Sequence, residues 1–287
     1  MKEIVILSGK GGTGKTSICA SFAVLAESAV IVDCDVDAAD LHLVLKPNVM
    51  EEYEFTGGQI ATIDPDKCLS CAICQKLCRY DSILLDNEKY RVDELACEGC
   101  GVCAHFCPAD AICMSDSING HWFVSETRAG TMVHAKLGLA AENSGKLVAL
   151  IKNKAKEIAK DTSAQFVIVD GPPGIGCPVI SSLSGADQVV VVTEPSVSGI
   201  HDLERVMELA GHFKVPVSII INKYDINEEK TNEIDNLVLA HGIPVLARIP
   251  YDPMFTKAQI AEMSVVEYRE CLATEEIRKA WMQLSGQ

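Results

Sequence analysis

The sequence predicts a doubly wound α/β fold with a mainly parallel sheet, interrupted by a small α+β domain rich in cysteine. Short runs of β-branched and other apolar residues end abruptly in Gly, Asp or Pro, and helix-like segments separate them. Such continuous apolar strands suit a parallel sheet that helices cover on both faces. The alternation stops between residues 60 and 118, which hold nine of the 13 cysteines.

The expected strands and helices alternate along the chain, so right-handed crossovers should join parallel neighbours. The expected strands are Ile4–Leu7, Val30–Val32, Phe166–Val169, Val189–Val192, Ser218–Ile221 and Pro244–Ile249. The expected helices are Lys15–Glu27, Lys146–Lys160, His201–His212, Glu228–Ala240 and Ala273–Leu284. We therefore assign 1–59 and 119–287 to the α/β domain and 60–118 to an inserted domain.

Length, charge and hydropathy exclude several classes of protein. With 287 residues, of which 48% are hydrophobic, the chain can bury a full core. The 25 basic and 40 acidic residues give a net charge of −15, so we expect no nucleic-acid partner. The first apolar run is too short for a signal peptide, and no apolar window reaches the roughly 18 residues of a spanning helix. We expect a cytoplasmic protein without direct membrane anchoring.

A glycine-rich loop between the first expected strand and helix matches the phosphate-binding pattern G-x-x-x-x-G-K-[ST]. Glycines let backbone N–H groups surround phosphate oxygens, and the helix dipole adds to the field. Lys15 would contact the β- and γ-phosphates of ATP, and the Thr16 hydroxyl would bind Mg²⁺. The predicted nucleotide-binding residues of this loop are Gly9, Gly11, Gly12, Thr13, Gly14, Lys15 and Thr16.

An additional lysine, Lys10, makes the loop resemble that of the MinD/ParA class of P-loop ATPases. Residues 10–16 read K-G-G-T-G-K-T, as in the altered loop of that class, which belongs to the SIMIBI division of P-loop NTPases and to the CobQ/CobB/MinD/ParA family. The resemblance implies that Lys10 reaches across a nucleotide-sandwiched dimer to the partner's phosphates, like an arginine finger in trans. The alternative is that Lys10 is an ordinary loop lysine whose ammonium group is solvated. We expect an ATP-dependent homodimer, or a heterodimer with a similar paralogue.

The same resemblance implies roles for polar residues that follow other expected strands. Asp35 is the candidate for orienting the attacking water, and Asp40 belongs to the switch that follows, although Asp37 leaves the register open. Asp170 opens the sequence DGPPG and would hold Mg²⁺ through water. Asn222 would contact adenine, while an ordinary turn at the strand end explains it equally well. Lys10, Lys15, Asp35 and Asp170 are the predicted catalytic set.

The insertion contains two copies of the spacing C-x₂-C-x₂-C-x₃-C, with a period of 29 residues. The copies are Cys68, Cys71, Cys74 and Cys78, and Cys97, Cys100, Cys103 and Cys107. This is the bacterial ferredoxin spacing, in which the fourth cysteine binds the other cluster. The predicted ligand sets of two [4Fe–4S] clusters are Cys68, Cys71, Cys74 and Cys107, and Cys97, Cys100, Cys103 and Cys78. A zinc ribbon is the alternative, and Arg79 replaces the usual proline after the first copy.

An ATPase with an inserted ferredoxin domain indicates an ATP-coupled electron carrier or redox-controlled switch. Residues 61–118 hold ten Asp or Glu and five Lys or Arg, so their charge favours a basic redox partner. Two alternatives remain open. One is a carrier or scaffold for Fe–S assembly of the Mrp type, and the other is a spatial organiser of cell division or cargo whose clusters sense redox state.

Overall fold

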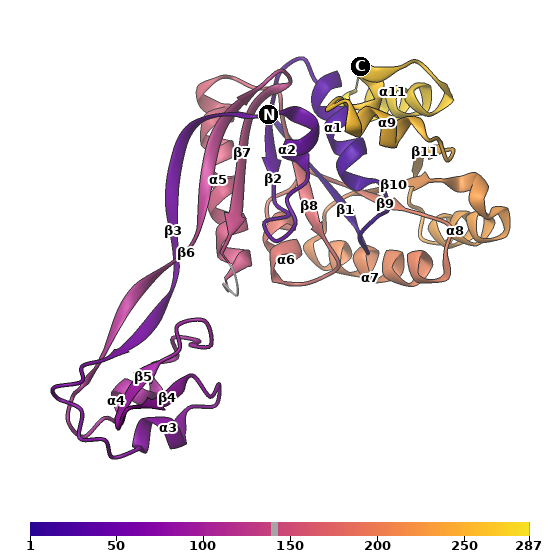
Figure 1. Ribbon diagram of the computed structural model, residues 1–287. Coiled ribbons are helices and arrows are strands. Elements are labelled where there is room, and N and C mark those ends of the chain that lie inside the picture. Colours follow the sequence, from indigo (N-terminus) through magenta and orange to yellow (C-terminus); the bar gives the residue numbers. More distant parts are fainter. Residues whose placement is uncertain (139–142, 287) are drawn as a thin grey trace. The chain divides into compact units, whose positions relative to one another are not determined.

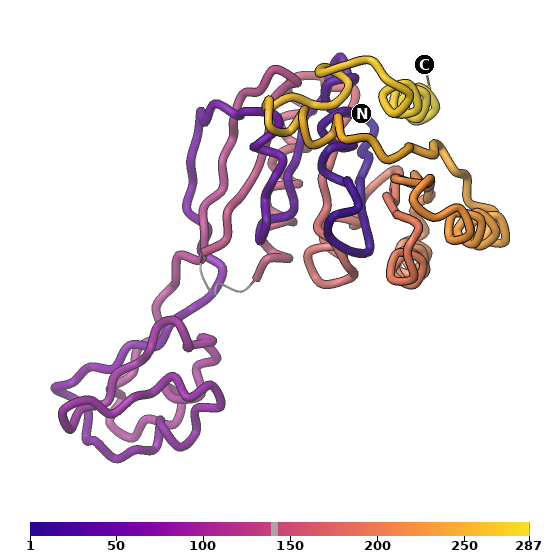
Figure 2. The backbone as a smooth tube through the Cα atoms, turned by 45° about the vertical axis from the view of Figure 1, so that its right-hand side comes forward, coloured from indigo at the N-terminus to yellow at the C-terminus, as the bar shows by residue number. Residues whose placement is uncertain are grey.

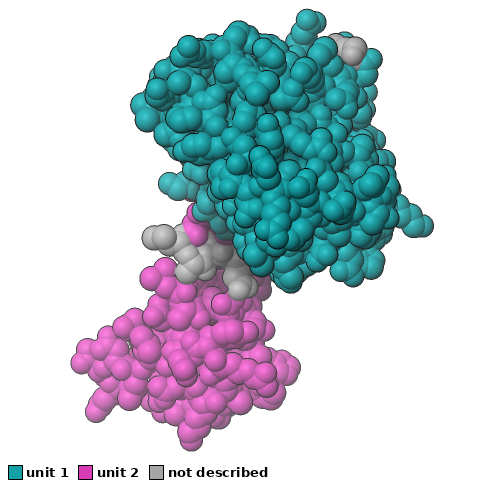
Figure 3. All heavy atoms as spheres, turned by 90° about the vertical axis from the view of Figure 1, so that its right-hand side faces the viewer, with its two compact units in different colours: residues 1–52, 122–136, 144–287 teal, residues 53–121, 137–143 magenta. Residues whose placement is uncertain are grey.

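The computed structural model describes residues 1–138 and 143–286 (Figure 1). The described chain forms two compact units, which Figure 3 distinguishes by colour. Unit 1 contains residues 1–52, 122–136 and 144–286, and unit 2 contains residues 53–121, 137, 138 and 143. The unit boundaries therefore fall within strands β3 (Asn48–Ile63) and β6 (Ile112–Thr127).

A nine-stranded sheet orders the described strands as β11-β10-β9-β1-β8-β2-β7-β6-β3. All the neighbours from β11 to β7 pair in parallel. The remaining bounds are β1 Lys2–Ser8, β2 Ala29–Asp33, β7 Gly130–Leu137, β8 Phe166–Pro173, β9 Gln188–Thr193, β10 Val217–Asn222 and β11 Val245–Ile249. The predicted α/β fold with a mainly parallel sheet is confirmed.

Strand β1 lies inside the sheet between β8 and β9, which both come much later in the sequence. In open α/β sheets such a reversal leaves a crevice at the carboxyl ends of the strands. The apolar run Ile4–Leu7 within β1 is fully buried, as expected for a strand covered on both faces. We therefore expect a ligand site at the loops that follow β1, β2 and β8.

Three strands of this sheet have no counterpart among the expected strands, namely β3, β6 and β7. Most side chains at the start of β3 are exposed, and β6 mixes exposed and buried positions. A strand without a continuous apolar run or a clean alternation of apolar and polar residues leaves little trace in hydropathy. Hydrogen bonding to neighbouring strands defines these elements instead.

Helices cover both faces of the sheet in unit 1 (Figure 2). Against one face lie α1 Lys15–Leu25, α2 Leu41–Leu45, α9 Met254–Ile260, α10 Val265–Tyr268 and α11 Leu272–Ser285. Against the other lie α5 Ser144–Asp161, α6 Cys177–Leu183, α7 Val197–Phe213 and α8 Glu228–Ala240. A 3₁₀ turn, η1, covers Tyr224–Ile226. Within the described residues no helix combines the length and apolar character needed to cross a bilayer.

Unit 2 is built from short elements around a small core. Strands β4 (Ile83–Asp86) and β5 (Lys89–Val92) form an antiparallel hairpin. Its two-residue turn, Asn87 and Glu88, has φ angles of 47° and 66°, the positive values that a tight hairpin turn needs. The helices are α3 (Ile73–Leu77) and α4 (Val102–His105). The buried core residues are Ala61, Ile63, Ile83, Tyr90 and Ile112, with cysteines packed around them.

Trp281 of α11 joins two parts of the unit 1 core. Its ring lies 5.5 Å from that of Phe22 on α1 and 5.1 Å from that of Phe166 on β8, and only 4% of the residue is exposed. We expect Trp281→Ala to lower the free energy of unfolding by about 3–5 kcal/mol, because it leaves a cavity. Urea unfolding measures this, with Met282→Ala, at an exposed neighbour, as the control. If Trp281→Ala lowered the free energy of unfolding as little as the control does, Trp281 would not be the core residue described here.

Candidate functional site

A cleft of about 1230 Å³ opens at the carboxyl ends of the parallel strands of unit 1. The loop after β1 forms its floor, and residues that follow β2, β8, β10 and β11 form its walls. Of the predicted nucleotide-binding residues, Gly11, Gly12, Thr13, Gly14, Lys15, Thr16, Asp40 and Asn222 line the cleft. Asp35 lines it as well. Gly9, Lys10 and the buried Asp170 do not.

The loop from Gly9 to Gly14 has the shape that an anion site requires. Gly12 and Gly14 have φ angles of 81° and 91°, which side chains rarely tolerate, and Gly14 caps the N-terminus of α1. A Cβ atom at Gly14 would lie 2.4 Å from Nδ2 of Asn222. The first turn of α1 therefore presents its free backbone N–H groups toward the cleft.

The end of β10 holds this loop in place. Nδ2 of Asn222 donates a hydrogen bond to the carbonyl of Thr13 at 2.7 Å, and this contact is buried. Nζ of Lys223 donates to the carbonyl of Gly12 at 2.9 Å. The family resemblance implied that Asn222 contacts adenine, with a turn at the strand end as the alternative, and it gave Lys223 no role. The described contacts give both residues a role in fixing the loop.

A buried ion pair joins the loop to β8. Nζ of Lys15 lies 2.6 Å from Oδ1 of Asp170, and the two side chains are 7% and 1% exposed. Burial lowers the pKa of Lys15, but the nearby Asp170 carboxylate outweighs it and raises that pKa. Oδ2 of Asp170 and the hydroxyl of Thr13 are buried and have no hydrogen-bond partner among the residues that the structure describes. A magnesium-bound phosphate would supply the partners that these oxygens lack.

Carboxylates after β2 complete this side of the cleft. Asp33 is fully buried, and its oxygens accept hydrogen bonds from the backbone N–H groups of Asp35 and Leu41. Burial and the neighbouring Asp170 raise the pKa of Asp33 well above its usual range. Asp33 thus positions the segment that carries Asp35 and Asp40. Asp40 lies exposed, immediately before α2.

Asp35 is only partly buried and faces the cleft. Burial raises its pKa to about 6, and repulsion from Asp170 adds to the rise although Lys15 opposes it. A carboxyl group with this pKa is largely ionised at neutral pH and is a stronger base than an ordinary carboxylate. This combination suits a residue that accepts a proton from water.

Lys10 turns away from the cleft toward α7. Its Nζ lies 2.7 Å from Glu194 and 3.0 Å from the hydroxyls of Ser196 and Ser198. Glu194 also pairs with Lys223 at 2.9 Å. Burial raises the pKa of Glu194, but the two lysines outweigh it and lower that pKa. Glu194 is a residue that sequence reasoning missed, because it is remote from the loop in the chain.

Gly9 is required by packing against α7. A Cβ atom at this position would lie 2.2 Å from Cβ of Asp202.

The opposite wall of the cleft contains Pro250, Tyr251, Asp252, Phe255 and Gln259. Tyr251 is 57% exposed, and its backbone N–H donates to Asp225 at 2.7 Å. An aromatic and amide wall of this kind can accommodate a planar base.

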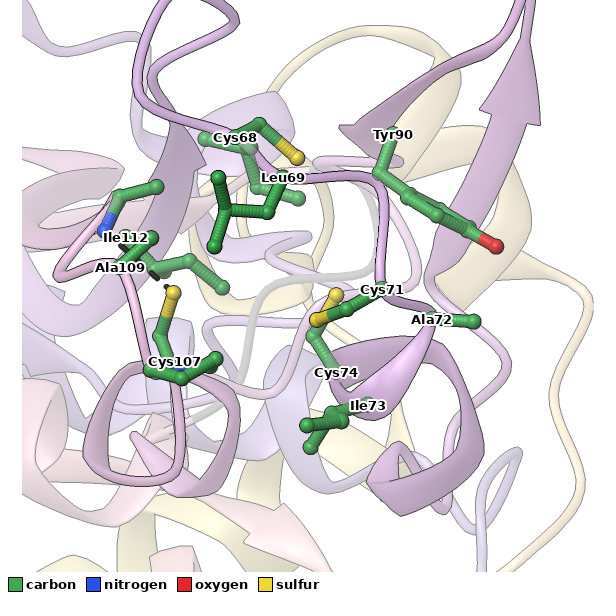
Figure 4. A pocket seen from close by; sticks show the side chains of 13 residues that line it. Cys68, Leu69, Cys71, Ala72, Ile73, Cys74, Tyr90, Cys107, Ala109 and Ile112 are labelled. Atoms are coloured by element: carbon green, nitrogen blue, oxygen red, sulfur yellow. Dashed lines mark hydrogen bonds between the residues drawn. The ribbon is translucent and has the colours of Figure 1, made fainter.

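In unit 2, a small cavity is lined by four of the predicted cluster cysteines, Cys68, Cys71, Cys74 and Cys107. Figure 4 shows the side chains around it, with Cys107 approaching from a different segment than the other three. The remaining wall is largely apolar and includes Ile63, Leu69, Ile73, Tyr90 and Ile112.

A second small cavity is lined by Cys78, Cys97, Cys100 and Cys103. The fourth cysteine of each copy therefore lies beside the first three of the other copy. Among the residues that the structure describes, no group of three or more His, Cys, Asp or Glu side chains is arranged to hold a metal ion. Cys113 is exposed and lines neither cavity.

Comparison with known proteins agrees with the geometry of the cleft. Residues 4–265 match the family model for the CobQ/CobB/MinD/ParA nucleotide binding domain. The chain belongs to this family. An uncharacterized protein of Methanocaldococcus jannaschii is 35% identical over 229 residues, which span 78% of this chain and 79% of that protein.

Other MinD/ParA relatives are more distant. The septum site-determining protein MinD of Bacillus subtilis is 24% identical over 266 residues, spanning 90% of this chain and 79% of that protein. The structure of MinD complexed with Mg-ADP from Pyrococcus horikoshii shares the fold, with a TM-score of 0.60 and 18% identity over 99% of this chain and 95% of that one. The chain is a nucleotide-binding, MinD/ParA-like ATPase.

The raised pKa of Asp35 predicts a pH-dependent effect on stability. The folded protein keeps the proton on Asp35 up to about pH 6, whereas an unfolded chain releases it near pH 4. Ionisation of Asp35 therefore costs folding free energy as the pH rises through this interval. We expect Asp35→Asn to gain stability relative to the wild type between pH 4.5 and pH 7.5.

Urea unfolding without nucleotide or metal at the two pH values measures this change. Asp37→Asn, at an exposed position two residues away, is the control for loss of charge. If the difference in unfolding free energy between Asp35→Asn and the wild type were the same at both pH values, the pKa of Asp35 would not be raised in the folded protein.

Proposed function

We propose that this protein binds and hydrolyses MgATP in the cleft of unit 1 and carries two [4Fe–4S] clusters in unit 2. In this proposal, nucleotide-dependent dimerisation is coupled to electron transfer or to a redox-controlled switch. The observation that carries the ATPase half is the buried Lys15–Asp170 pair, which lies at the N-terminus of α1 and has an unpartnered carboxylate oxygen.

The residues of the cleft fit MgATP. The N–H groups of the loop and Lys15 would neutralise the phosphates, while Thr16 and Asp170 would hold Mg²⁺, directly or through water. When bound, the metal would help to neutralise the negative charge of the phosphates. Asp35 would orient a water molecule and accept its proton, and its pKa of about 6 leaves it ionised at neutral pH.

Lys10 would act from the partner subunit. In the described chain it is bound to Glu194, Ser196 and Ser198, so its ammonium group is held outside its own cleft. This arrangement supports the role in trans that the family resemblance implies. Such a cation stabilises charge that develops on the transferred phosphoryl group and raises the rate by roughly 10³–10⁵.

The donor set of unit 2 fits two [4Fe–4S] clusters. Each cavity is lined by four cysteines in the crossed pattern of bacterial ferredoxins. Cys68, Cys71, Cys74 and Cys107 would hold one cluster, and Cys97, Cys100, Cys103 and Cys78 the other. When bound, the clusters supply one-electron chemistry at low potential, and the apolar surroundings limit contact with water.

The names of the relatives favour one second candidate, a spatial organiser. Several of them are septum site-determining proteins. A fluorescent fusion distinguishes the two: a localised pattern that disappears in Lys15→Ala would favour the organiser. A uniform distribution in both chains, with ATPase activity that depends on cluster reduction, would favour redox coupling. A carrier for Fe–S assembly would instead pass iron to an acceptor that lacks it.

Lys10→Ala should lower ATP turnover by about a thousandfold or more while nucleotide binding persists, because it removes a cation that acts only on the partner's phosphates. Mixing two inactive variants tests this sharply. A Lys10→Ala chain keeps Asp35, and an Asp35→Asn chain keeps Lys10, so their heterodimer contains one complete site. ATP hydrolysis by the mixture checks the prediction.

A role for Lys10 within its own subunit would leave the mixture as inactive as its components. Lys214→Ala, at an exposed lysine that follows α7, is the matched control and should keep wild-type turnover. Nucleotide binding to each variant is measured separately, so that loss of binding is not mistaken for loss of catalysis.

The crossed ligand sets predict the iron content of cysteine variants purified without oxygen. Cys107→Ser should lose one cluster, and adding Cys68→Ser should remove nothing further, because both residues serve the same site. Adding Cys97→Ser to Cys107→Ser should remove both clusters. Uncrossed sets would give the reverse pattern, and Cys113→Ser, outside both cavities, should retain all iron.

A further inference from the structure

The two halves of unit 2 share a backbone framework. In one half the N–H of Asp64 donates to the carbonyl of Ala111 at 2.8 Å, and 29 residues further along the chain the N–H of Asp93 donates to the carbonyl of Ser82 at 2.7 Å. Each aspartate also accepts a hydrogen bond from the N–H two residues later, at 3.0 and 3.1 Å. Side chains at equivalent positions can therefore be compared directly.

The halves differ at positions 82 and 111. In both, a backbone N–H at this position donates to the fourth cysteine of the motif, from Ala111 to Cys107 and from Ser82 to Cys78. Only the first half adds a side-chain contact, because Oγ of Ser82 lies 3.1 Å from Sγ of Cys78. Ser82 is 3% exposed, so water competes little for this hydroxyl.

We propose that Ser82 makes the two cluster sites unequal, so that an electron delivered to unit 2 rests on the site formed by Cys97, Cys100, Cys103 and Cys78. We call this the Cys97 site, and the site formed by Cys68, Cys71, Cys74 and Cys107 the Cys68 site. This inference rests on the proposed function, because it requires both sites to hold clusters.

Charge determines which of the two sites has the higher reduction potential. A cluster gains one negative charge on reduction, and hydrogen bonds to its sulfur ligands stabilise that charge. A metal-bound thiolate has no proton, so the Ser82 hydroxyl must be the donor to Cys78. The Cys68 site lacks this bond at Cys107 and has a more apolar wall, with Leu69, Ile73 and Tyr90. Low polarity disfavours additional charge.

Glu98, which also lines the Cys97 cavity, acts in the opposite direction. Its negative charge would disfavour reduction there. The Glu98 residue is exposed, so solvent and salt screen the carboxylate, whereas the Ser82 contact is buried. The hydrogen bond therefore dominates. Electron exchange between the sites then oxidises the Cys68 site and reduces the Cys97 site, with no change in atoms, once a low-potential one-electron donor has reduced the unit.

The test is a potentiometric titration of the full chain, purified without oxygen and followed by EPR, with dithionite as reductant. The wild type should show two midpoint potentials. Ser82→Ala should lower the higher one and leave the lower one in place. We expect the electron ratio between the sites to change about tenfold, which corresponds to about 59 mV for one electron.

Two further variants keep the test decisive. Ala111→Ser places a hydroxyl at the equivalent position beside Cys107 and should raise the lower potential, even if Ser82→Ala loses its clusters. Ser70→Ala is the matched control, because its hydroxyl donates to the carbonyl of Glu88 at 2.9 Å and not to a sulfur. It should leave both potentials unchanged.

The outcomes separate this inference from the function on which it rests. A wild-type chain without iron or an EPR signal would overturn the proposed function itself. Iron for two clusters, with potentials that neither Ser82→Ala nor Ala111→Ser moves, would overturn only the role of Ser82. So would a shift of equal size in Ser70→Ala, or a shift of the lower potential in Ser82→Ala.

Discussion

The buried ion pair between Lys15 and Asp170 is the interaction on which the rest of the cleft depends. Two charges at this depth are stable only when each has the other as a partner. The parallel register of the sheet brings them together, because Asp170 on β8 pairs with Ile6 on β1 and also with Asp33 on β2. A slip of one residue between these strands would leave a charge alone in the core.

The ends of two further strands fix the loop that contains Lys15. Asn222 at the end of β10 and Lys223 directly after it donate hydrogen bonds to carbonyls of the loop. Glu194, which follows β9, pairs with both Lys223 and Lys10. The loop is thus attached through polar contacts to elements that lie about 200 residues away in the chain. Carbonyls used in these contacts face the protein, which leaves the N–H groups free for an anion.

The sequence predicted much of this architecture, since a strand segment covered on both faces, such as Ile4–Leu7 of β1, is apolar throughout. It did not predict β3 and β6, because their exposed positions carry no regular hydropathy. The phosphate loop was recognisable because its glycines and Lys15 have a fixed local spacing. Glu194 was not recognisable, since its importance comes from contacts across the fold. The cysteines were likewise recognisable from their local spacing. Ser82 was not, because it is a single residue outside that pattern.

The duplication in unit 2 explains why such single residues matter. Because both halves use equivalent backbone hydrogen bonds, the backbone alone would give two similar sites. Any functional difference must then come from side chains that differ between the copies. Ser82 and Ala111 are one such pair, and Arg79 and Pro108 are another. The Ser82 hydroxyl places an additional hydrogen-bond donor beside Cys78, which makes the Cys97 site the more favourable place for negative charge.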